Sequence, residues 1–80
     1  MISVRQLKAA RVLLAWSQGD LAQASGISEP TIARLESTDG PVRGRPDTAV
    51  ALIGALEKAG VEFIPENGGG AGVRLRKKKR

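Results

Sequence analysis

The sequence predicts a mainly α fold, in which four helices are followed by a C-terminal β-hairpin. Three observations favour this fold. Apolar residues recur at steps of three and four through most of the first sixty positions. Serines stand where helices would begin, and Gly26 and Gly60 stand where helices would end. After Gly60 apolar and charged residues alternate, which is typical of strands.

A chain of 80 residues has room for one small hydrophobic core. We therefore expect residues 1–60 to form a helical domain and residues 61–76 to form the hairpin. The remaining residues, 77–80, are all basic and are expected to be a disordered tail.

The first helix is predicted from about Val4 to Ala15 or Trp16. Ser3 and Gln6 have the spacing of a capping box, in which each side chain accepts from the other residue's backbone N–H. The apolar stripe of this helix consists of Val4, Leu7, Ala10 and Leu14.

Two short helices should follow. Ser17 caps the first of them, with Asp20 in its first turn, and Gly26 ends it in a left-handed conformation. Ser28 caps the next helix, and Pro30 in its first turn has no N–H to leave unpaired. Their inward residues are Leu21, Ala22, Ile32 and Leu35.

Residues 37–45 are predicted to be a loop, because two glycines and a proline interrupt the apolar period. A fourth helix should begin at Pro46 and end at Gly60. Its buried face is expected to consist of Val50, Leu52, Ile53 and Leu56.

The hairpin is predicted from two strand-like segments, 61–64 and 73–76, joined by a glycine-rich turn. One face of this ribbon is apolar and the other is charged. A two-stranded ribbon is marginal in water, so the apolar face needs a cover. We expect pairing with the same segment of a second chain; the alternative is a hairpin that folds back to complete the core of its own chain. The dimerisation residues expected on this face are Val61, Phe63, Val73 and Leu75.

Composition excludes several classes of function. The chain has no His, Cys or Tyr, so a hydrolytic triad, a zinc site and an imidazole proton shuttle are ruled out. We expect no enzymatic activity, no metal and no cofactor. The longest uncharged apolar stretch, residues 49–56, is too short to span a bilayer, and no targeting segment is visible. A cytoplasmic protein without membrane contact is the resulting expectation.

The net charge of +5 is unevenly distributed. Residues 74–80 hold six of the thirteen basic side chains, whereas residues 1–73 hold seven basic and eight acidic ones. Bulk charge therefore attracts polyanions only to the tail, and specific binding of a nucleic acid has to be argued from local features.

Residues 21–36 have the pattern of a helix-turn-helix. Ala22 is small where two helices would cross, and Gly26 supplies the positive φ of the turn. Ile27 and Ile32 would fill the angle between the helices. The second helix of such a unit exposes its N-terminus and one polar face, as a helix that reads the major groove must.

The stretch from Leu14 to Glu36 resembles the Cro/C1-type helix-turn-helix regulators, also called the XRE family. With the flanking helices the resemblance covers residues 3–59. It implies a lambda-repressor-like DNA-binding domain. It also implies a transcriptional regulator that binds double-stranded DNA, usually as a homodimer on a palindromic operator. The chain departs from the family in a longer loop after Glu36 and in a hairpin where a fifth helix is usual.

The resemblance also implies roles for particular residues. Gln18 would open the second helix and contact the DNA backbone or a base, and Arg11 and Glu36 would form a structural ion pair. Arg43 and Arg45 are well placed in the loop for phosphates. The DNA-binding residues expected on the recognition helix, residues 28–36, are Ser28, Glu29, Pro30, Thr31 and Arg34.

Several of these residues have simpler interpretations. Ser28 is first a helix cap, and Glu29 is favourable near a helix N-terminus whether or not it accepts from a cytosine N4 amine. Arg34 would bind guanine or phosphate, or else be a solvated surface side chain.

One alternative function stays open, a protein-interaction module of antitoxin or anti-activator type on the same scaffold. The near-neutral body and Glu29 are compatible with it. DNA binding is favoured if the cationic residues share one face, namely Arg5, Lys8, Arg34, Arg43 and Arg45.

Overall fold

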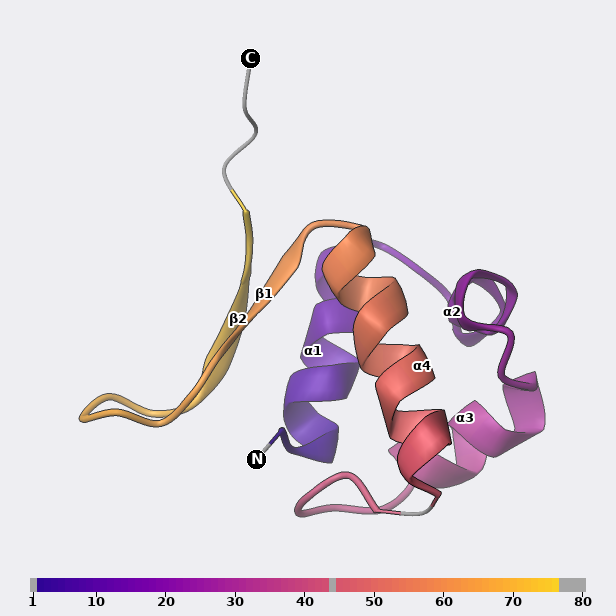
Figure 1. Cartoon of the computed structure of the whole chain (residues 1–80), viewed down its shortest axis with the longest axis horizontal. Helices are drawn as coiled ribbons and strands as arrows, with labels where there is room; N and C mark the ends of the chain where they lie inside the picture. Colours follow the sequence, from indigo (N-terminus) through magenta and orange to yellow (C-terminus); the bar gives the residue numbers. More distant parts are fainter. Residues whose placement is uncertain (1, 44, 77–80) are drawn as a thin grey trace.

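The computed structural model describes residues 2–43 and 45–76, and the predicted tail at 77–80 lies outside them. Four helices are followed by a two-stranded antiparallel hairpin, as predicted (Figure 1). The helices are α1 (Val4–Leu13), α2 (Gln18–Ser25), α3 (Glu29–Glu36) and α4 (Pro46–Lys58), and the strands are β1 (Val61–Ile64) and β2 (Gly72–Leu75).

The predicted helix starts are confirmed by their hydrogen bonds. Ser3 and Gln6 form a capping box on α1, and Ser17 and Asp20 form a second one on α2. Ser28 Oγ accepts from the Thr31 backbone N–H at the start of α3. These caps satisfy N–H groups that have no partner within their own helix, so three serines fix where three helices begin.

The predicted end of the first helix is wrong by two residues or more. α1 ends at Leu13, and Ala15 adopts a left-handed conformation with φ of 58°. The Trp16 N–H donates to the Arg11 carbonyl across this turn. Gly26, in contrast, has the predicted positive φ, 78°, where α2 ends.

One core joins all four helices and the hairpin. Its fully buried side chains come from every element except β2: Leu7, Ala10, Leu21, Ile32, Leu52, Leu56 and Val61. Leu14, Ile27 and Leu35 pack against this cluster while partly exposed. The prediction for Val50 is wrong, because its side chain is 70% exposed on the outer face of α4.

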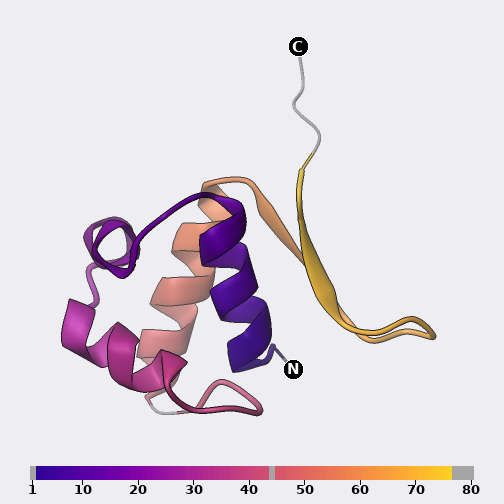
Figure 2. The same ribbon diagram turned by 180° about the vertical axis from the view of Figure 1, so that it is seen from behind.

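The hairpin packs against the helices on the side away from α3. Val61 pairs with Leu75 and Phe63 with Val73, so these four residues share a face of the ribbon, as predicted. α1 contacts both strands and α4 contacts β1. Seen from behind, α1 and α4 lie between the hairpin and the α2–α3 pair (Figure 2). The hairpin and α3 therefore occupy opposite sides of the molecule.

Within the ranges that the structure describes, no helix is long and apolar enough to cross a membrane.

Candidate nucleic-acid interface

Helix α3, the expected recognition helix, presents one polar face to solvent. Ile32 on its inner side is fully buried, whereas Glu29, Pro30 and Arg34 are exposed. Ser28, just before the helix, donates its hydroxyl hydrogen to Thr31 Oγ1 at 2.8 Å while it caps the backbone. The helix N-terminus and the Arg34 side chain are thus accessible together, which is what reading base edges requires.

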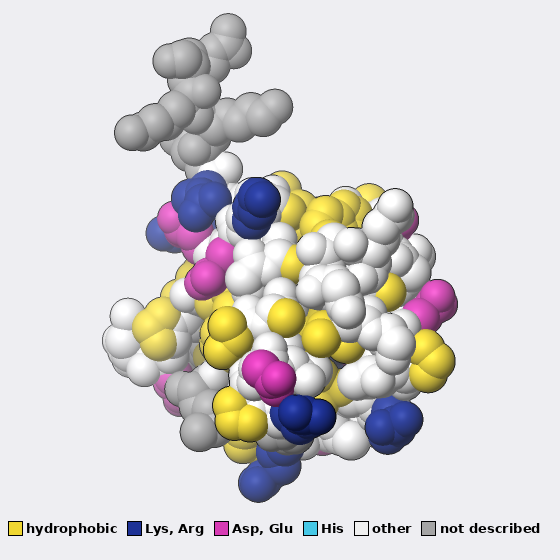
Figure 3. Space-filling view, turned by 45° about the vertical axis from the view of Figure 1, so that its right-hand side comes forward, with side chains coloured by type: hydrophobic (Ala, Val, Ile, Leu, Met, Phe, Trp, Pro, Cys, Tyr) yellow, Lys and Arg dark blue, Asp and Glu magenta, His cyan; other side chains and the backbone are white. Residues whose placement is uncertain are grey.

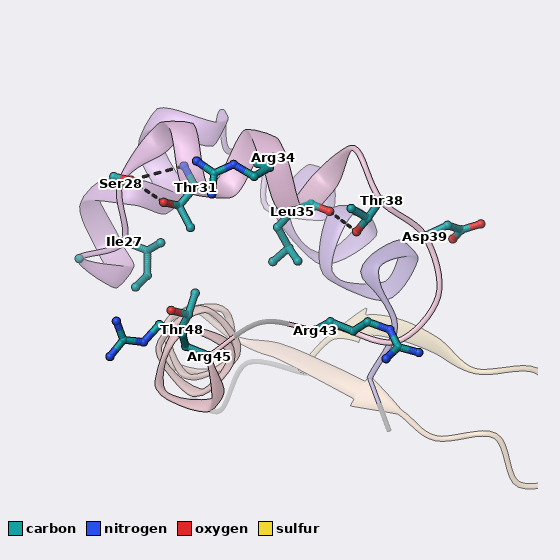
Figure 4. A pocket seen from close by; sticks show the side chains of 11 residues that line it. Ile27, Ser28, Thr31, Arg34, Leu35, Thr38, Asp39, Arg43, Arg45 and Thr48 are labelled. Carbon is teal, nitrogen blue, oxygen red and sulfur yellow. Dashed lines mark hydrogen bonds between the residues drawn. The ribbon is translucent and has the colours of Figure 1, made fainter.

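A groove of about 600 Å³ runs between α3 and the segment that leads into α4. Arg34 lies on the α3 side, and Arg43 and Arg45 lie on the opposite side (Figure 4). Arg45 points toward the Ile27 end of the groove and Arg43 toward the Asp39 end. Three arginines from two segments therefore surround one concave surface, an arrangement that suits the anionic backbone of a nucleic acid.

These three arginines have little internal compensation. Among the described residues, neither Arg34 nor Arg43 forms an ion pair. Arg45 lies 3.7 Å from Asp47, but both side chains are about four-fifths exposed (83% and 75%), where such pairs contribute little. Their charges remain available to an incoming polyanion.

Of the other two cations named in the sequence analysis, Lys8 is a half-buried residue of α1, and Arg5 is bound to an acidic residue of the loop after α3. Arg5 forms two hydrogen bonds with Asp39, of 3.0 and 3.1 Å, although both side chains are largely exposed (79% and 64%), so water still screens the pair. Figure 3 shows the side of the molecule that carries α2, α3 and α4, where Lys and Arg side chains stand apart with acidic ones among them. On this side the groove is lined by three basic side chains, those of Arg34, Arg43 and Arg45.

The loop from Ser37 to Arg43 is held against the start of α1. The Val4 N–H donates to the Gly40 carbonyl at 2.8 Å, and the Val42 N–H donates to the Ile2 carbonyl at 3.0 Å. A hydrogen bond from the Gly40 backbone, together with Arg5, lowers the pKa of Asp39 below its usual value. This anchoring fixes the segment that carries Arg43 beside α3. Nothing in the sequence pattern indicated these pairings, because they join positions more than thirty residues apart.

A buried ion pair supports the interface from beneath. Arg11 donates to both carboxylate oxygens of Glu36, at 2.8 and 2.9 Å, and to the Trp16 carbonyl at 2.7 Å. The Glu36 side chain is only 4% exposed and that of Arg11 is 16% exposed. Burial raises the pKa of Glu36, but the hydrogen bonds from Arg11 and Gln18 outweigh it, and the net pKa lies below the ordinary value. The hydrogen bond to Glu36 likewise raises the pKa of Arg11.

Gln18 belongs to this network as well as to the surface of α2. Its Nε2 donates to Glu36 Oε1 at 3.0 Å, and the residue is partly exposed. The side chain expected on DNA is therefore oriented by the carboxylate that ends α3. The sequence offers no signal for this contact, because nothing in local spacing relates the two positions.

The Glu29 carboxylate lies close to Gly19 in the first turn of α2. A Cβ placed on Gly19 would lie 3.3 Å from Glu29 Oε1, so the absence of a side chain at Gly19 makes room for the carboxylate. The N-terminus of α2 carries partial positive charge, which favours an anion at this position. Glu29 thus has a structural partner and remains exposed at the front of the recognition helix.

The predicted dimerisation residues lie mostly within the chain's own core. Val61 is fully buried, and Phe63 and Val73 pack against the core cluster. Leu75 is 48% exposed. Within the single chain three of these four residues are therefore covered by its own helices, as in the alternative arrangement. Pairing of hairpins between two chains stays a prediction, in which Leu75 and the strand edges would make the contacts.

Comparisons with known proteins agree with this geometry. A protein-family model described as helix-turn-helix matches residues 7–60, which is more than half of the chain. A search of curated proteins found no match.

Proposed function

The chain belongs to the helix-turn-helix family of Cro/C1 type, and from this membership we propose that it is a sequence-specific regulator of transcription. In this proposal α3 enters the major groove of double-stranded DNA. The protein acts as a homodimer on a palindromic operator, in the cytoplasm, without enzymatic activity and without a cofactor.

The observation that carries the proposal is the groove between α3 and α4, where the exposed face of α3 and the charges of Arg34, Arg43 and Arg45 come together. Arg43 and Arg45 take phosphates and set the position of the domain on the duplex. Arg34, about one and a half turns into α3, binds a guanine edge or a neighbouring phosphate.

The N-terminal end of α3 supplies the remaining contacts. Ser28 turns its exposed hydroxyl hydrogen from Thr31 Oγ1 to a phosphate oxygen, and Glu29 accepts from a cytosine N4 amine. Pro30 and Thr31 pack against base edges. Gln18, held by Glu36, contacts the adjacent backbone from the start of α2.

Selection of bound sequences from a pool of random duplexes tests the proposal. The expected result is one enriched motif with two-fold symmetry, because two copies of the same helix read both half-sites. Arg34→Ala should lose enrichment at one position in each half-site. The matched control is Arg74→Ala, since Arg74 pairs with Glu62 on the hairpin, away from α3. A pool without any enriched motif at low salt would contradict the proposal.

The second candidate is the protein-interaction module, and two observations favour it: Glu29 is exposed on α3, and residues 1–73 are nearly neutral. A protein partner would bind through the same face of α3. The pool experiment separates the two functions, because such a module enriches no DNA sequence.

A further inference from the structure

The outer face of α4 is an uncovered surface that the proposed function leaves unexplained. No element lies over this helix in the view of Figure 1. Val50 is 70% exposed, more than any other large hydrophobic side chain in residues 2–43 and 45–76. Gly54, one turn later on the same face, is also exposed, and a Cβ built on it meets no atom within 4 Å. The face thus carries a projecting apolar side chain beside a residue that has no side chain.

These two features are complementary in an antiparallel pair of α4 helices. A two-fold axis perpendicular to both helices places each residue opposite the one whose number brings the sum to a constant. With position 50 opposite position 54, that sum is 104. The Val50 side chain then enters the space over the partner's Gly54, and the same contact is repeated across the axis. A glycine at this place also lets the two helix backbones approach closely.

Charges on the same face fit this register to within one residue, because positions 47 and 58 sum to 105 and are thus about 1.5 Å along the axis from facing each other. Asp47 and Lys58 are about three helical turns apart, so they lie on nearly one line along α4. In the antiparallel pair the partner's Lys58 is one residue beyond the level of Asp47, within reach of its long side chain, and the same pairing recurs at the other end. Glu57 lies roughly 80° around the helix from that line, which keeps it away from the partner's Asp47.

We propose that the outer face of α4 is the homodimer surface, with Val50 packed over the partner's Gly54 and Asp47 paired with the partner's Lys58. The inference rests on the proposed function, because a regulator that binds a palindromic operator needs a surface for dimerisation. α4 begins at the groove that also contains Arg34, so a two-fold axis on α4 lies near both recognition helices. The apolar face of the hairpin, in contrast, is largely covered within the chain and lies on the far side of α1.

Charge reversal is the first test, read by sedimentation velocity over a range of protein concentrations. Asp47→Lys should convert two attractive pairs into repulsive ones and raise the dimer dissociation constant at least about tenfold. Lys58→Glu alone should do the same. The double variant restores opposite charges across the axis and should recover most of the affinity. A double variant as weak as the single ones would overturn the register.

Gly54→Leu is the second test, because it separates dimerisation from folding. Leucine has a higher helix propensity than glycine and has free space in the single chain, so the thermal stability of the monomer should not fall. The side chain fills the space over position 54, and the dimer should dissociate at concentrations about tenfold higher or more. Val12→Glu is the control, since Val12 is 63% exposed on α1 and lies outside the proposed surface. A Gly54→Leu protein that dimerises like the parent would contradict the proposal, as would a parent that is monomeric throughout.

Cross-linking tests the contact directly, because the chain has no natural cysteine. Chains with Val50→Cys mixed with chains with Gly54→Cys should form a disulfide under mild oxidation, and Val12→Cys chains should not. Together with the selection of DNA sequences, this experiment distinguishes a failure of the dimer proposal from a failure of the proposed function. If a cross-linked dimer forms but enriches no DNA motif, the α4 interface is supported and the regulator function is contradicted. If the protein is a monomer that binds single half-sites, DNA binding is supported and the α4 interface is contradicted.

Discussion

At the scale of single residues, Arg11 connects three parts of the chain. Its guanidinium joins α1 to the end of α3 through Glu36 and to the α1–α2 turn through the Trp16 carbonyl. Glu36 in turn accepts from Gln18 at the start of α2. One nearly buried carboxylate thereby sets the relative positions of the two helices of the helix-turn-helix unit.

Glu36→Gln should lower the free energy of unfolding at pH 7 by roughly 3 kcal/mol, because the largely buried Arg11 charge loses its counter-charge. The loss should show in urea denaturation. Glu66→Gln, in the exposed hairpin turn, is the control and should change stability little. Equal midpoints for the Glu36→Gln protein and the parent would show that the ion pair does not stabilise the fold.

The same residue predicts a dependence on pH. The pKa of Glu36 is lower in the folded protein than in the unfolded chain, so its contribution is complete above the unfolded value, about 4.3 for glutamate. The contribution is then lost as the pH falls through the folded-state pKa. Denaturation of the parent should show this loss below about pH 4, and the Glu36→Gln protein should show a flatter curve there. Parallel curves for the two proteins would refute this assignment.

Arg34→Ala should weaken specific DNA binding by roughly 1–3 kcal/mol and relax the preference at one base if the arginine contacts guanine. If it contacts only phosphate, affinity should fall equally for all sequences, and the salt dependence of binding should decrease by about one ion. Titrations at several salt concentrations distinguish the two. Unchanged affinity for the selected operator would remove Arg34 from the interface.

At the scale of elements, the hairpin is attached to α1 by the same glutamine that caps that helix. Gln6 is 6% exposed; its Oε1 accepts from the Ser3 N–H, and its Nε2 donates to the Ile64 and Gly72 carbonyls. A local capping residue is thus also the contact between two elements nearly sixty residues apart. The edge of the ribbon is fixed where its glycine-rich turn begins.

Gln6→Ala should destabilise the protein by roughly 2 kcal/mol, because it removes a cap and leaves two strand carbonyls without this donor. Amide exchange should accelerate most in β1 and β2. Gln23→Ala on the exposed side of α2 is the control. Protection of the strands equal to that in the parent would show that apolar packing alone holds the hairpin.

The end of α1 offers a test with opposite signs at two alanines. Ala15 has φ of 58°, a conformation that costs an L-residue roughly 1–2 kcal/mol and costs glycine almost nothing. Ala15→Gly should therefore leave the melting temperature unchanged or raise it. Ala9→Gly, on the exposed side of α1, should lower stability by about 1 kcal/mol. A decrease of similar size in both variants would contradict the strain at Ala15.

At the scale of the whole molecule, the α2–α3 pair and the hairpin lie on opposite sides. α2 and α3 face one side with the arginine-lined groove, and the hairpin closes the core on the other, with α1 and α4 between them (Figures 1 and 2). The hairpin is therefore part of the domain. Its Val61 is as buried as any core leucine.

Truncation after Gly60 should for this reason reduce the stability of the helical domain. The deletion removes Val61 from the core along with the packing of Phe63 and Val73, a loss on the order of 4 kcal/mol. A domain of this size has little stability beyond that. Thermal unfolding by circular dichroism should show a broad, low transition. A truncated protein as stable as the full chain would show that the hairpin is dispensable to the fold.

The sequence by itself determined the elements and the type of site. Ser3, Ser17 and Ser28 mark the helix starts and Gly26 marks the α2 end, because caps and left-handed turns depend on residues three or four positions apart. The alternation after Gly60 indicated the strands for the same local reason. The role of α3 as recognition helix, with Arg34 on it and Arg43 and Arg45 in the following loop, stays a prediction from the helix-turn-helix pattern and the resemblance to a known family.

Only the tertiary structure decided which faces are covered and which charges are free. Val50 fits the apolar period of α4 yet points to solvent, since periodicity shows that a face exists but does not show what packs on it. Arg5 is paired with Asp39 and Gln18 with Glu36, while Arg34 and Arg43 stay without a partner among the described residues. Such pairings join positions far apart in the chain, so their geometry exists only after the helices have packed.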